Sequence, residues 1–135
     1  MDCVFCKIIA NQLPAHKVYE DESCVAFLDR QPVNPGHTLV VSKQHFVSMV
    51  DAPAEVVGQL AKVAKKVGAA CIAATGAKGY NLSVNNGAAA GQVVFHLHFH
   101  VIPRQPSDEF KLWEGKDYKT GEPEQIATLM REKLL

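Results

Sequence analysis

The chain has 135 residues and 47% of them are hydrophobic, so we expect one globular domain over residues 1–135 with an apolar core. Fourteen basic residues balance fourteen acidic ones, which argues against a nucleic-acid polymer or an anionic membrane as the partner. The N-terminus lacks the pattern of a signal peptide and no apolar run is long enough for a bilayer, so we expect a cytoplasmic protein.

In chain order, the first three predicted elements are strands, at residues 17–20, 23–28 and 37–42. Asp21 and Glu22 form the turn of a hairpin between the first two, and a loop rich in proline and glycine precedes the third. A long helix is expected to begin at Asp51 and to reach about residue 74, because apolar residues recur there at helical spacing.

The second half of the chain predicts two further strands, at residues 79–85 and 93–103, with a loop at residues 86–92 between them. A short final helix is predicted at residues 123–135. Strands outnumber helices and short turns join most of them. The pattern therefore favours an α+β fold, with an antiparallel sheet and helices packed on it.

The stretch HLHFHVIP carries histidines at alternate positions. Successive side chains of a strand point to opposite faces, so one face is expected to hold His96, His98 and His100. The other face is apolar at every position, Val93 and Phe95 included, and is expected to pack under the long helix. A half-buried strand whose polar face happens to be histidine is the alternative without a function, but three histidines in register favour a chemical role.

Two kinds of chemistry use such a face. His-x-His on a strand can place two imidazole nitrogens on a zinc ion, although hydrolytic metal sites also use carboxylates, which are absent between Val84 and Asp108. Alternatively, one imidazole is a nucleophile in phosphoryl or nucleotidyl transfer, through a phosphoramidate that water cleaves. The loop NNGAAAGQ leads into the strand and offers backbone N–H groups to a phosphate.

Several segments together resemble the histidine triad (HIT) superfamily, whose signature is His-φ-His-φ-His-φ-φ with φ apolar: GHTLVVSKQH, NNGAAAGQ and HLHFHVIPR. CVFCKIIANQLPAHKVYEDE and AFLDRQPVNPGH are similar to its Hint-like branch of bacterial type, so the resemblance extends from Cys3 to Arg104. It implies a nucleotidyl hydrolase or transferase, usually a homodimer, with a five-stranded antiparallel sheet in each subunit.

The resemblance assigns catalytic roles to three histidines. His98 matches the nucleophile that attacks the α-phosphorus and becomes nucleotidylated. His100 matches the histidine that contacts the phosphate and the bridging oxygen, and His37 matches one that borders and orients the catalytic ring. His16 matches no functional position and is expected on the surface.

The resemblance also assigns a substrate-binding set. The apolar walls around a purine base correspond to Phe5, Ile8 and Phe27, and the carboxylate that binds the ribose hydroxyls corresponds to Asp29. The phosphate region corresponds to Asn85, Gln92 and the backbone N–H groups of Val93 and Val94. Without the resemblance, the apolar three would be interpreted as core residues and Asp29 as a turn residue.

Two positions depart from the family pattern. Val93 stands where many relatives have serine or threonine, so a hydroxyl that aids leaving-group protonation is missing. Arg30 follows the ribose aspartate, where Hint relatives carry an apolar residue. The first departure is expected to slow turnover of poor leaving groups, and the second leaves the base preference open.

Cys3-x-x-Cys6 indicates metal or redox use in a reducing compartment. A structural zinc takes four ligands, and the resemblance to bacterial-type relatives supplies two more, His45 and His96. Because all four are present, we expect a structural Zn²⁺ rather than a redox pair, and no organic cofactor.

Two classes of function follow. One is a nucleotide hydrolase that cleaves at the α-phosphate of a purine nucleoside phosphoramidate or related adenylylated compound, with a dinucleoside polyphosphate hydrolase as its variant. The other is a non-catalytic nucleotide-binding regulatory protein. The intact triad favours the enzyme.

The homodimer that the resemblance implies fits the small residues of the long helix, Gly58, Ala61 and Ala69, and the open edges of the sheet.

Overall fold

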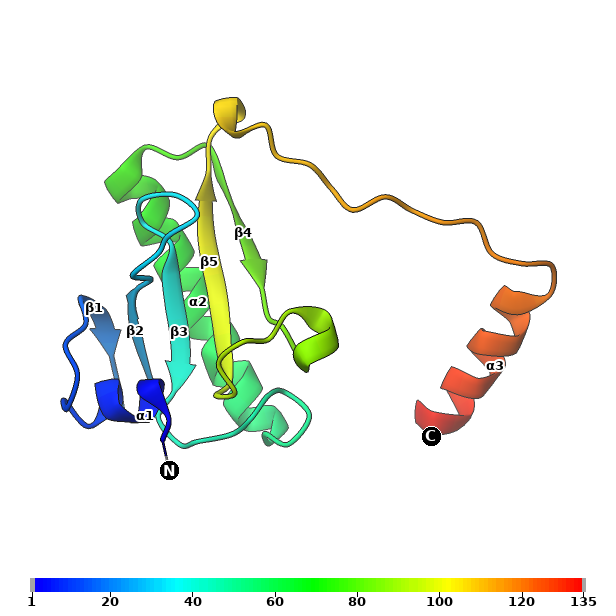
Figure 1. The fold of residues 1–135 in the computed structure, drawn as a ribbon, viewed down its shortest axis with the longest axis horizontal. Coiled ribbons are helices and arrows are strands. Elements are labelled where there is room, and N and C mark those ends of the chain that lie inside the picture. The colour runs from blue at the N-terminus through cyan, green and yellow to red at the C-terminus, as the bar shows by residue number, and fades with distance from the viewer. Residues whose placement is uncertain (1, 135) are drawn as a thin grey trace.

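The computed structural model describes residues 2–134. Five strands form one sheet in the order β1-β2-β3-β5-β4, and every neighbouring pair is antiparallel (Figure 1). The strands are β1 (Lys17–Glu20), β2 (Cys24–Leu28), β3 (Thr38–Ser42), β4 (Gly79–Ser83) and β5 (His98–Arg104). The expected α+β fold with a five-stranded antiparallel sheet is confirmed.

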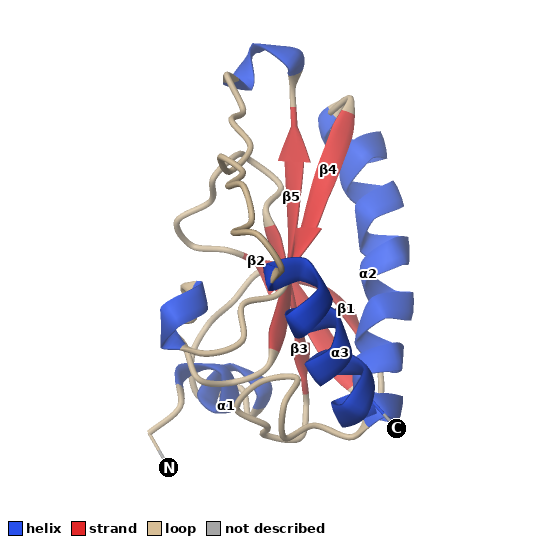
Figure 2. Ribbon diagram, turned by 90° about the vertical axis from the view of Figure 1, so that its right-hand side faces the viewer, coloured by secondary structure: helices blue, strands red, loops and turns tan. Residues whose placement is uncertain are grey.

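Three α-helices accompany the sheet: α1 (Val4–Ile9), α2 (Ala54–Thr75) and α3 (Glu122–Leu134). Figure 2 shows α2 along one face of the sheet and α1 on the other side. The long helix and the C-terminal helix confirm the prediction, although Leu135, its expected last residue, lies outside the described residues. Within residues 2–134, no helix has the length and apolar character needed to cross a membrane.

The helix α2 begins three residues later than expected. Asp51 lies in the turn before it, where its carboxylate accepts hydrogen bonds from the backbone N–H groups of Val47 and Ser48. Pro53 is the N-cap, and the helix ends at Gly76, which has the left-handed conformation that favours glycine. Its buried stripe has helical spacing: Leu60, Val63, Ala64, Val67, Gly68 and Cys71.

Strands β2 and β3 pack against an apolar cluster on each face of the sheet. On one face, Ala26 and Val40 pack with the buried stripe of α2. On the other, Phe27 and Val41 pack in a second cluster with Phe5 of α1. This is why CVAFL and TLVVS are nearly continuous apolar runs rather than alternating ones. The second cluster places α1 directly beside the histidine face.

The prediction of a strand over residues 93–103 is wrong at its start, because β5 begins at His98. Val93 is 84% exposed and Phe95 is 47% exposed, so neither belongs to the core face. The chain stays out of the sheet up to Leu97, whose backbone N–H donates to the carbonyl of Phe46. Leu97, Phe99 and Val101 do pack under α2.

Gly36 allows a tight approach between the loop before β3 and the end of α2. Its φ is +100°, and a Cβ there would lie 2.8 Å from Cγ2 of Thr75 and 3.1 Å from Sγ of Cys71. We therefore expect Gly36→Ala to lower the free energy of unfolding by about 1–3 kcal/mol. Urea denaturation measures this, with Gly115→Ala as the control, because nothing lies within 4 Å of a Cβ at Gly115. Equal stability of the two variants would contradict the expectation.

Candidate active site and metal centre

His98 has one ring nitrogen fixed as a hydrogen-bond donor. Its Nδ1 lies 2.6 Å from the backbone carbonyl oxygen of His96, which can only accept. In the neutral ring the proton is therefore on Nδ1, and Nε2 carries a free lone pair. Burial lowers the pKa of His98 below its ordinary value of 6.5. The ring is thus neutral at pH 7 and has the tautomer that a nucleophilic Nε2 requires.

Two further imidazoles have their tautomers set by one backbone group. The N–H of Val33 donates to Nδ1 of His37 at 3.1 Å, so the proton of His37 is on Nε2. That Nε2 lies 3.0 Å from Nδ1 of His100 and donates to it. The proton of His100 is consequently on its own Nε2, which is left as a hydrogen-bond donor.

Burial keeps both of these rings neutral as well. It lowers the pKa of His100 to about 4, with the neighbouring His98 and His37 contributing, and it lowers the pKa of His37. The ring centroids of His98 and His100 are 4.9 Å apart. The site therefore combines an imidazole with a free Nε2 and, beside it, an imidazole that donates through Nε2.

Asp29 lies just beyond the end of β2, at the mouth of the loop that leads to His37. Its backbone N–H donates to the carbonyl of His37, and its Oδ1 accepts from the N–H of Gln31 at 2.8 Å. Oδ2 is 3.6 Å from Nε2 of His37, which is too far for a hydrogen bond. This oxygen remains available to a ligand.

Asp29, His37 and His100 also have donor atoms within 4.8 Å of one another, a spacing at which a metal ion can bind. A histidine ligand needs an unprotonated nitrogen, and it usually donates a hydrogen bond through its other nitrogen. His37 has the opposite arrangement, because Nδ1 accepts from Val33 and Nε2 carries the proton. The hydrogen bonds therefore disfavour a metal ion at this position.

The loop between β4 and β5 is tied together by Gln92. Its Oε1 accepts from the N–H of Gly87, and its Nε2 donates to the carbonyls of Val47 and Val94. Because these bonds use the whole amide, Gln92 shapes the loop rather than offering a free group. Asn85 makes one long bond, 3.4 Å to the carbonyl of Gly91.

The backbone of the same loop has free donors. In the described part of the chain, the N–H groups of Val93 and Val94 have no hydrogen-bond acceptor. Gly87 and Gly91 both have positive φ, which turns the loop sharply before β5. Unpaired N–H groups in such a turn form a site for an anion.

The three apolar residues expected to line a base are buried in the second cluster: Phe5, Ile8 and Phe27. The Phe5 ring packs edge-on against His98 at a centroid distance of 5.0 Å, and against Phe27 at 5.5 Å. Their burial agrees with a role as core residues. The same packing places the ring of Phe5 against His98, the histidine whose Nε2 is unprotonated.

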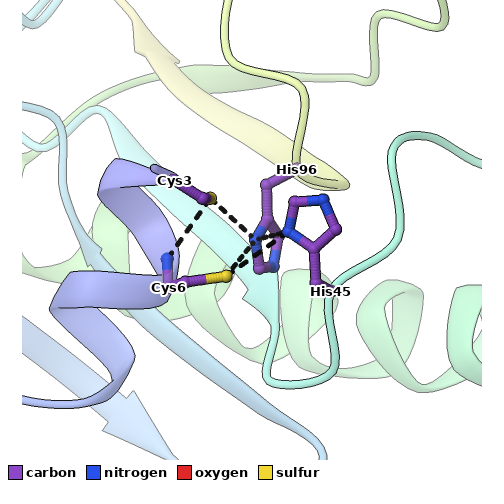
Figure 3. A group of neighbouring side chains, drawn as sticks. All are labelled: Cys3, Cys6, His45 and His96. Carbon is purple, nitrogen blue, oxygen red and sulfur yellow. Dashed lines mark hydrogen bonds between the residues drawn. The ribbon is translucent and has the colours of Figure 1, made fainter. Parts of the chain in front are cut away.

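Four side chains converge on one point at the other end of the triad, as Figure 3 shows: Cys3, Cys6, His45 and His96. Cys6 lies in α1 and Cys3 caps it, whereas His45 follows β3 and His96 precedes β5. Nδ1 of His96 lies 3.1 Å from Nδ1 of His45 and 3.3 Å from Sγ of Cys3. The first triad histidine thus faces the cysteines, away from His98.

The donor set fits a tetrahedral zinc ion. Zn–N bonds near 2.0 Å and Zn–S bonds near 2.3 Å separate tetrahedral ligand atoms by about 3.3–3.8 Å. The contacts between sulfur and nitrogen here are 3.3–3.5 Å. Nε2 of the fully buried His96 lies 2.6 Å from the carbonyl oxygen of Ser42, which fixes the proton there and leaves Nδ1 free for a metal.

The other two cysteines are outside this cluster. Burial raises the pKa of Cys24 to about 12, and Cys71 belongs to the buried stripe of α2, where its thiol donates to the carbonyl of Gly36. Both are inert packing residues.

A histidine nucleophile requires a fixed acceptor such as a backbone carbonyl for its other ring nitrogen, and His96 supplies one to His98. Sequence reasoning did not identify the groups that orient the other histidines. The short helix α1, which brings Phe5 and the cysteines to the triad, has only six residues and a cysteine N-cap, so it gives no helical pattern. The backbone groups of Val33, Ser42 and His96 set the tautomers, and no side-chain motif marks them.

Many curated relatives match this chain, and two that match over most of it are named for an activity. One, 46% identical over 87% of this chain, is an adenylylsulfatase named HINT3 from Arabidopsis thaliana; the chain spans 59% of that relative's length. The other, 38% identical over 98% of this chain and 96% of its own, is an adenosine 5′-monophosphoramidase named hnt1 from Schizosaccharomyces pombe.

Solved structures match as well. A crystal structure of a HIT family member from Bacillus subtilis superposes with a TM-score of 0.91, at 37% identity, over 100% of this chain and 99% of that one. A zinc-bound histidine triad family protein from Mycobacterium smegmatis superposes with a TM-score of 0.79, at 37% identity, over 98% and 96%. The model of the HIT domain matches residues 10–107. By its sequence, its fold and its arrangement of three histidines, this chain belongs to the HIT family.

Proposed function

We propose that the protein is a nucleotide hydrolase that cleaves adenylylated compounds, nucleoside phosphoramidates among them, through a covalent nucleotidyl-His98 intermediate. One observation carries the proposal: a neutral imidazole with a free Nε2 lies beside an imidazole whose Nε2 donates. The relatives support the substrate class, because one is named an adenylylsulfatase and the other an adenosine 5′-monophosphoramidase.

The reaction takes two displacements at phosphorus. In the first, Nε2 of His98 forms a bond to the α-phosphorus while the bond to the leaving group breaks, and the leaving group takes up one proton. In the second, water attacks the α-phosphorus, the bond to His98 breaks and one proton is released. The donor Nε2 of His100 stabilises the charge on the bridging atom and phosphate oxygens. The net result is the hydrolysis of one bond by one water molecule.

The remaining assignments follow the same geometry. The free N–H groups of Val93 and Val94 bind the phosphate, within a loop that Gln92 and Asn85 hold in shape. The free Oδ2 of Asp29 accepts from the ribose hydroxyls, and the base lies against the apolar cluster of Phe5, Ile8 and Phe27.

Turnover of a defined substrate panel tests the proposal. Purified protein is incubated with adenosine phosphoramidate, adenylyl sulfate and a diadenosine polyphosphate, and AMP release is followed by chromatography. We expect the first two to turn over faster than the third. Faster cleavage of the polyphosphate would favour a dinucleoside polyphosphate hydrolase. AMP binding without any turnover would favour the regulatory binding protein instead.

The pKa of His98 predicts how activity depends on pH. The neutral ring is the active form, so activity is lost as the pH falls through the pKa of His98. Burial lowers that pKa below 6.5, so kcat/KM should stay constant from pH 8 to about 6.5 and decline only below it. A profile that is already half-reduced above pH 6.5 would contradict the neutral, buried nucleophile.

We also propose a homodimer. The strand β4 pairs only with β5 among the described residues and leaves an open edge, and α2 exposes small residues at Gly58, Ala61 and Ala69. A second copy can extend the sheet at β4 and pack α2 against α2. Light scattering at micromolar concentration should report twice the 14.7 kDa of one chain. A mass of 14.7 kDa would exclude the dimer.

A further inference from the structure

The last fifth of the chain lies apart from the sheet. Residues 109–134, here called the C-terminal arm, leave the end of β5 and carry α3 well beyond the β4 edge (Figure 1). No residue of α3 is buried, and Trp113 in the arm is 92% exposed. A helix of 13 residues is only marginally stable alone. Its stability requires a surface to pack on.

The helix α3 has an apolar face suited to such a surface. Ile126, Leu129 and Met130 recur at helical spacing and are all exposed. Thr128 and Arg131 lie on the opposite side and bond to each other. Helices with one uncovered apolar stripe pack it against another element.

The direction of the arm is fixed where it begins. The carboxylate of Asp108 accepts from the backbone N–H of Gln105 and from the side-chain amide of Asn34, each at 2.8 Å. The guanidinium of Arg104 lies 3.2 Å from the same carboxylate and 4.7 Å from the ring centroid of Phe110. These contacts lead the chain away from its own sheet.

The extended position of the arm is shared with the crystal structure of one relative. The Bacillus subtilis protein superposes over the whole chain with a TM-score of 0.91. A score this high cannot be reached if a fifth of the chain lies elsewhere in that crystal structure. The relative therefore keeps its arm in the same outlying position.

An apolar groove on the α2 side of the sheet matches α3. It has a volume of about 270 Å³ and lies between the second half of α2 and strands β1 to β3. Its apolar lining includes Val18, Leu28, Val67, Ala70 and Ala74. Lysines flank it on α2, at Lys62, Lys65 and Lys66, and they complement the acidic first turn of α3, at Glu122 and Glu124.

The geometry places the groove of a second copy within reach of the arm. Strands are about 4.8 Å apart, so a copy that continues the sheet at β4 has its strands β3 to β1 roughly 15–25 Å beyond that edge. Residues 109–121 span at most about 43 Å when extended. In Figure 2, α3 extends from the level of the sheet toward the side on which α2 lies, which is the side of the groove.

We infer that the protein exchanges C-terminal arms: α3 of each copy docks, through Ile126, Leu129 and Met130, in the α2-side groove of the other copy. This inference rests on the proposed homodimer but not on the proposed catalysis. Leu28, Gly36 and Thr38 line the groove and adjoin Asp29 and His37, so the partner's helix supports the loop of the active site from behind.

Photo-crosslinking tests the exchange in the full-length protein. A photoreactive phenylalanine analogue replaces Leu129, and a matched protein carries it at Thr128 on the opposite side of α3. Equal amounts of ¹⁵N-labelled and unlabelled chains are mixed after unfolding and refolded together. We expect the Leu129 protein to give a dimer-sized product whose crosslinked peptides join labelled with unlabelled chains and map to β1, β2 or α2. The Thr128 protein should give little product.

Every other outcome counts against the exchange. Crosslinks within one chain would show that α3 folds back onto its own groove. Crosslinks between chains that map elsewhere, or none in a protein that light scattering shows to be dimeric, would reject the groove while keeping the dimer. A monomer by light scattering would remove both the dimer and the exchange, and AMP release from the substrate panel would remain a separate result.

A pair of substitutions gives an independent measure. Leu129→Asp places a charge on the docking face of α3, and Thr128→Asp places one on the opposite face. Undocking lets α3 unfold, so Leu129→Asp should speed trypsin cleavage within α3, at Arg131 and Lys133, by about tenfold or more. Thr128→Asp should leave the rate near that of the wild type. Equal rates in all three proteins would overturn the inference.

Discussion

We expect His98→Ala to lower kcat by about 10⁴-fold or more while AMP still binds. Nδ1 of His98 donates to a carbonyl, which leaves Nε2 unprotonated and without a hydrogen-bond partner among the described residues, whereas the unprotonated Nδ1 of His100 accepts from His37. The base, ribose and phosphate contacts come from other residues, so the dissociation constant of AMP should change by less than about threefold. Steady-state kinetics and calorimetry with AMP measure the two quantities.

Other histidines serve as comparisons. His100→Ala should cost less in kcat than His98→Ala, because it removes a hydrogen-bond donor rather than the nucleophile. His16→Ala, at an exposed position, should leave kcat/KM and stability unchanged. Turnover by His98→Ala at a rate within about tenfold of the wild type would reject the covalent mechanism.

Loss of one zinc ligand produces the second large effect, on stability rather than on chemistry. The purified protein should hold about one zinc per chain, and Cys3→Ser or Cys6→Ser should lower that content strongly. Four donors from three separate segments meet at this centre, so a bound metal would link α1 to the segment after β3 and the segment before β5, at one end of the sheet. A loss of about 3 kcal/mol would lower Tm by about 10 °C in a domain of this size.

Metal analysis and calorimetry check this expectation, with Cys71→Ser as the matched control, because that thiol is buried away from the centre. The control should keep its zinc. The ligand variants should retain some turnover, since neither cysteine contacts a proposed substrate group. Zinc-free wild-type protein, prepared without chelator, would contradict the structural metal, and His96 would then be a hydrogen-bonding core residue.

The sequence was sufficient to predict those parts of the fold that depend on local pattern. The buried stripe of α2 follows from apolar spacing, and the antiparallel sheet follows from strands that short turns join. The start of β5 was predicted too early, because VVFHLHFH alternates like a strand while Gln92 and the backbone of Leu97 hold its first residues out of the sheet. An alternating sequence shows which side chains are apolar, but it does not show at which residue hydrogen bonding to the neighbouring strand begins.

The site shows the same division. The alternating spacing of the three histidines predicts one shared face, and only the resemblance assigned His96 to the metal; in the structure His96 faces the cysteines while His98 and His100 face each other. That separation depends on α1 and on backbone acceptors at Ser42 and His96, which leave no trace in residue types. The sequence predicted the helix α3 but not that its apolar face is exposed, because a helical pattern does not indicate which surface the apolar face packs on.

The most direct test of the nucleotidyl-His98 mechanism is the capture of the intermediate. The protein is mixed with adenosine phosphoramidate, quenched within milliseconds and digested, and the peptides are analysed by mass spectrometry. We predict one added AMP on the peptide that contains His98, lost in acid and retained in alkali as expected for a phosphoramidate bond, and absent from the His98→Ala protein. An adduct on any other residue, or AMP release by the His98→Ala protein at the wild-type rate, would contradict the mechanism.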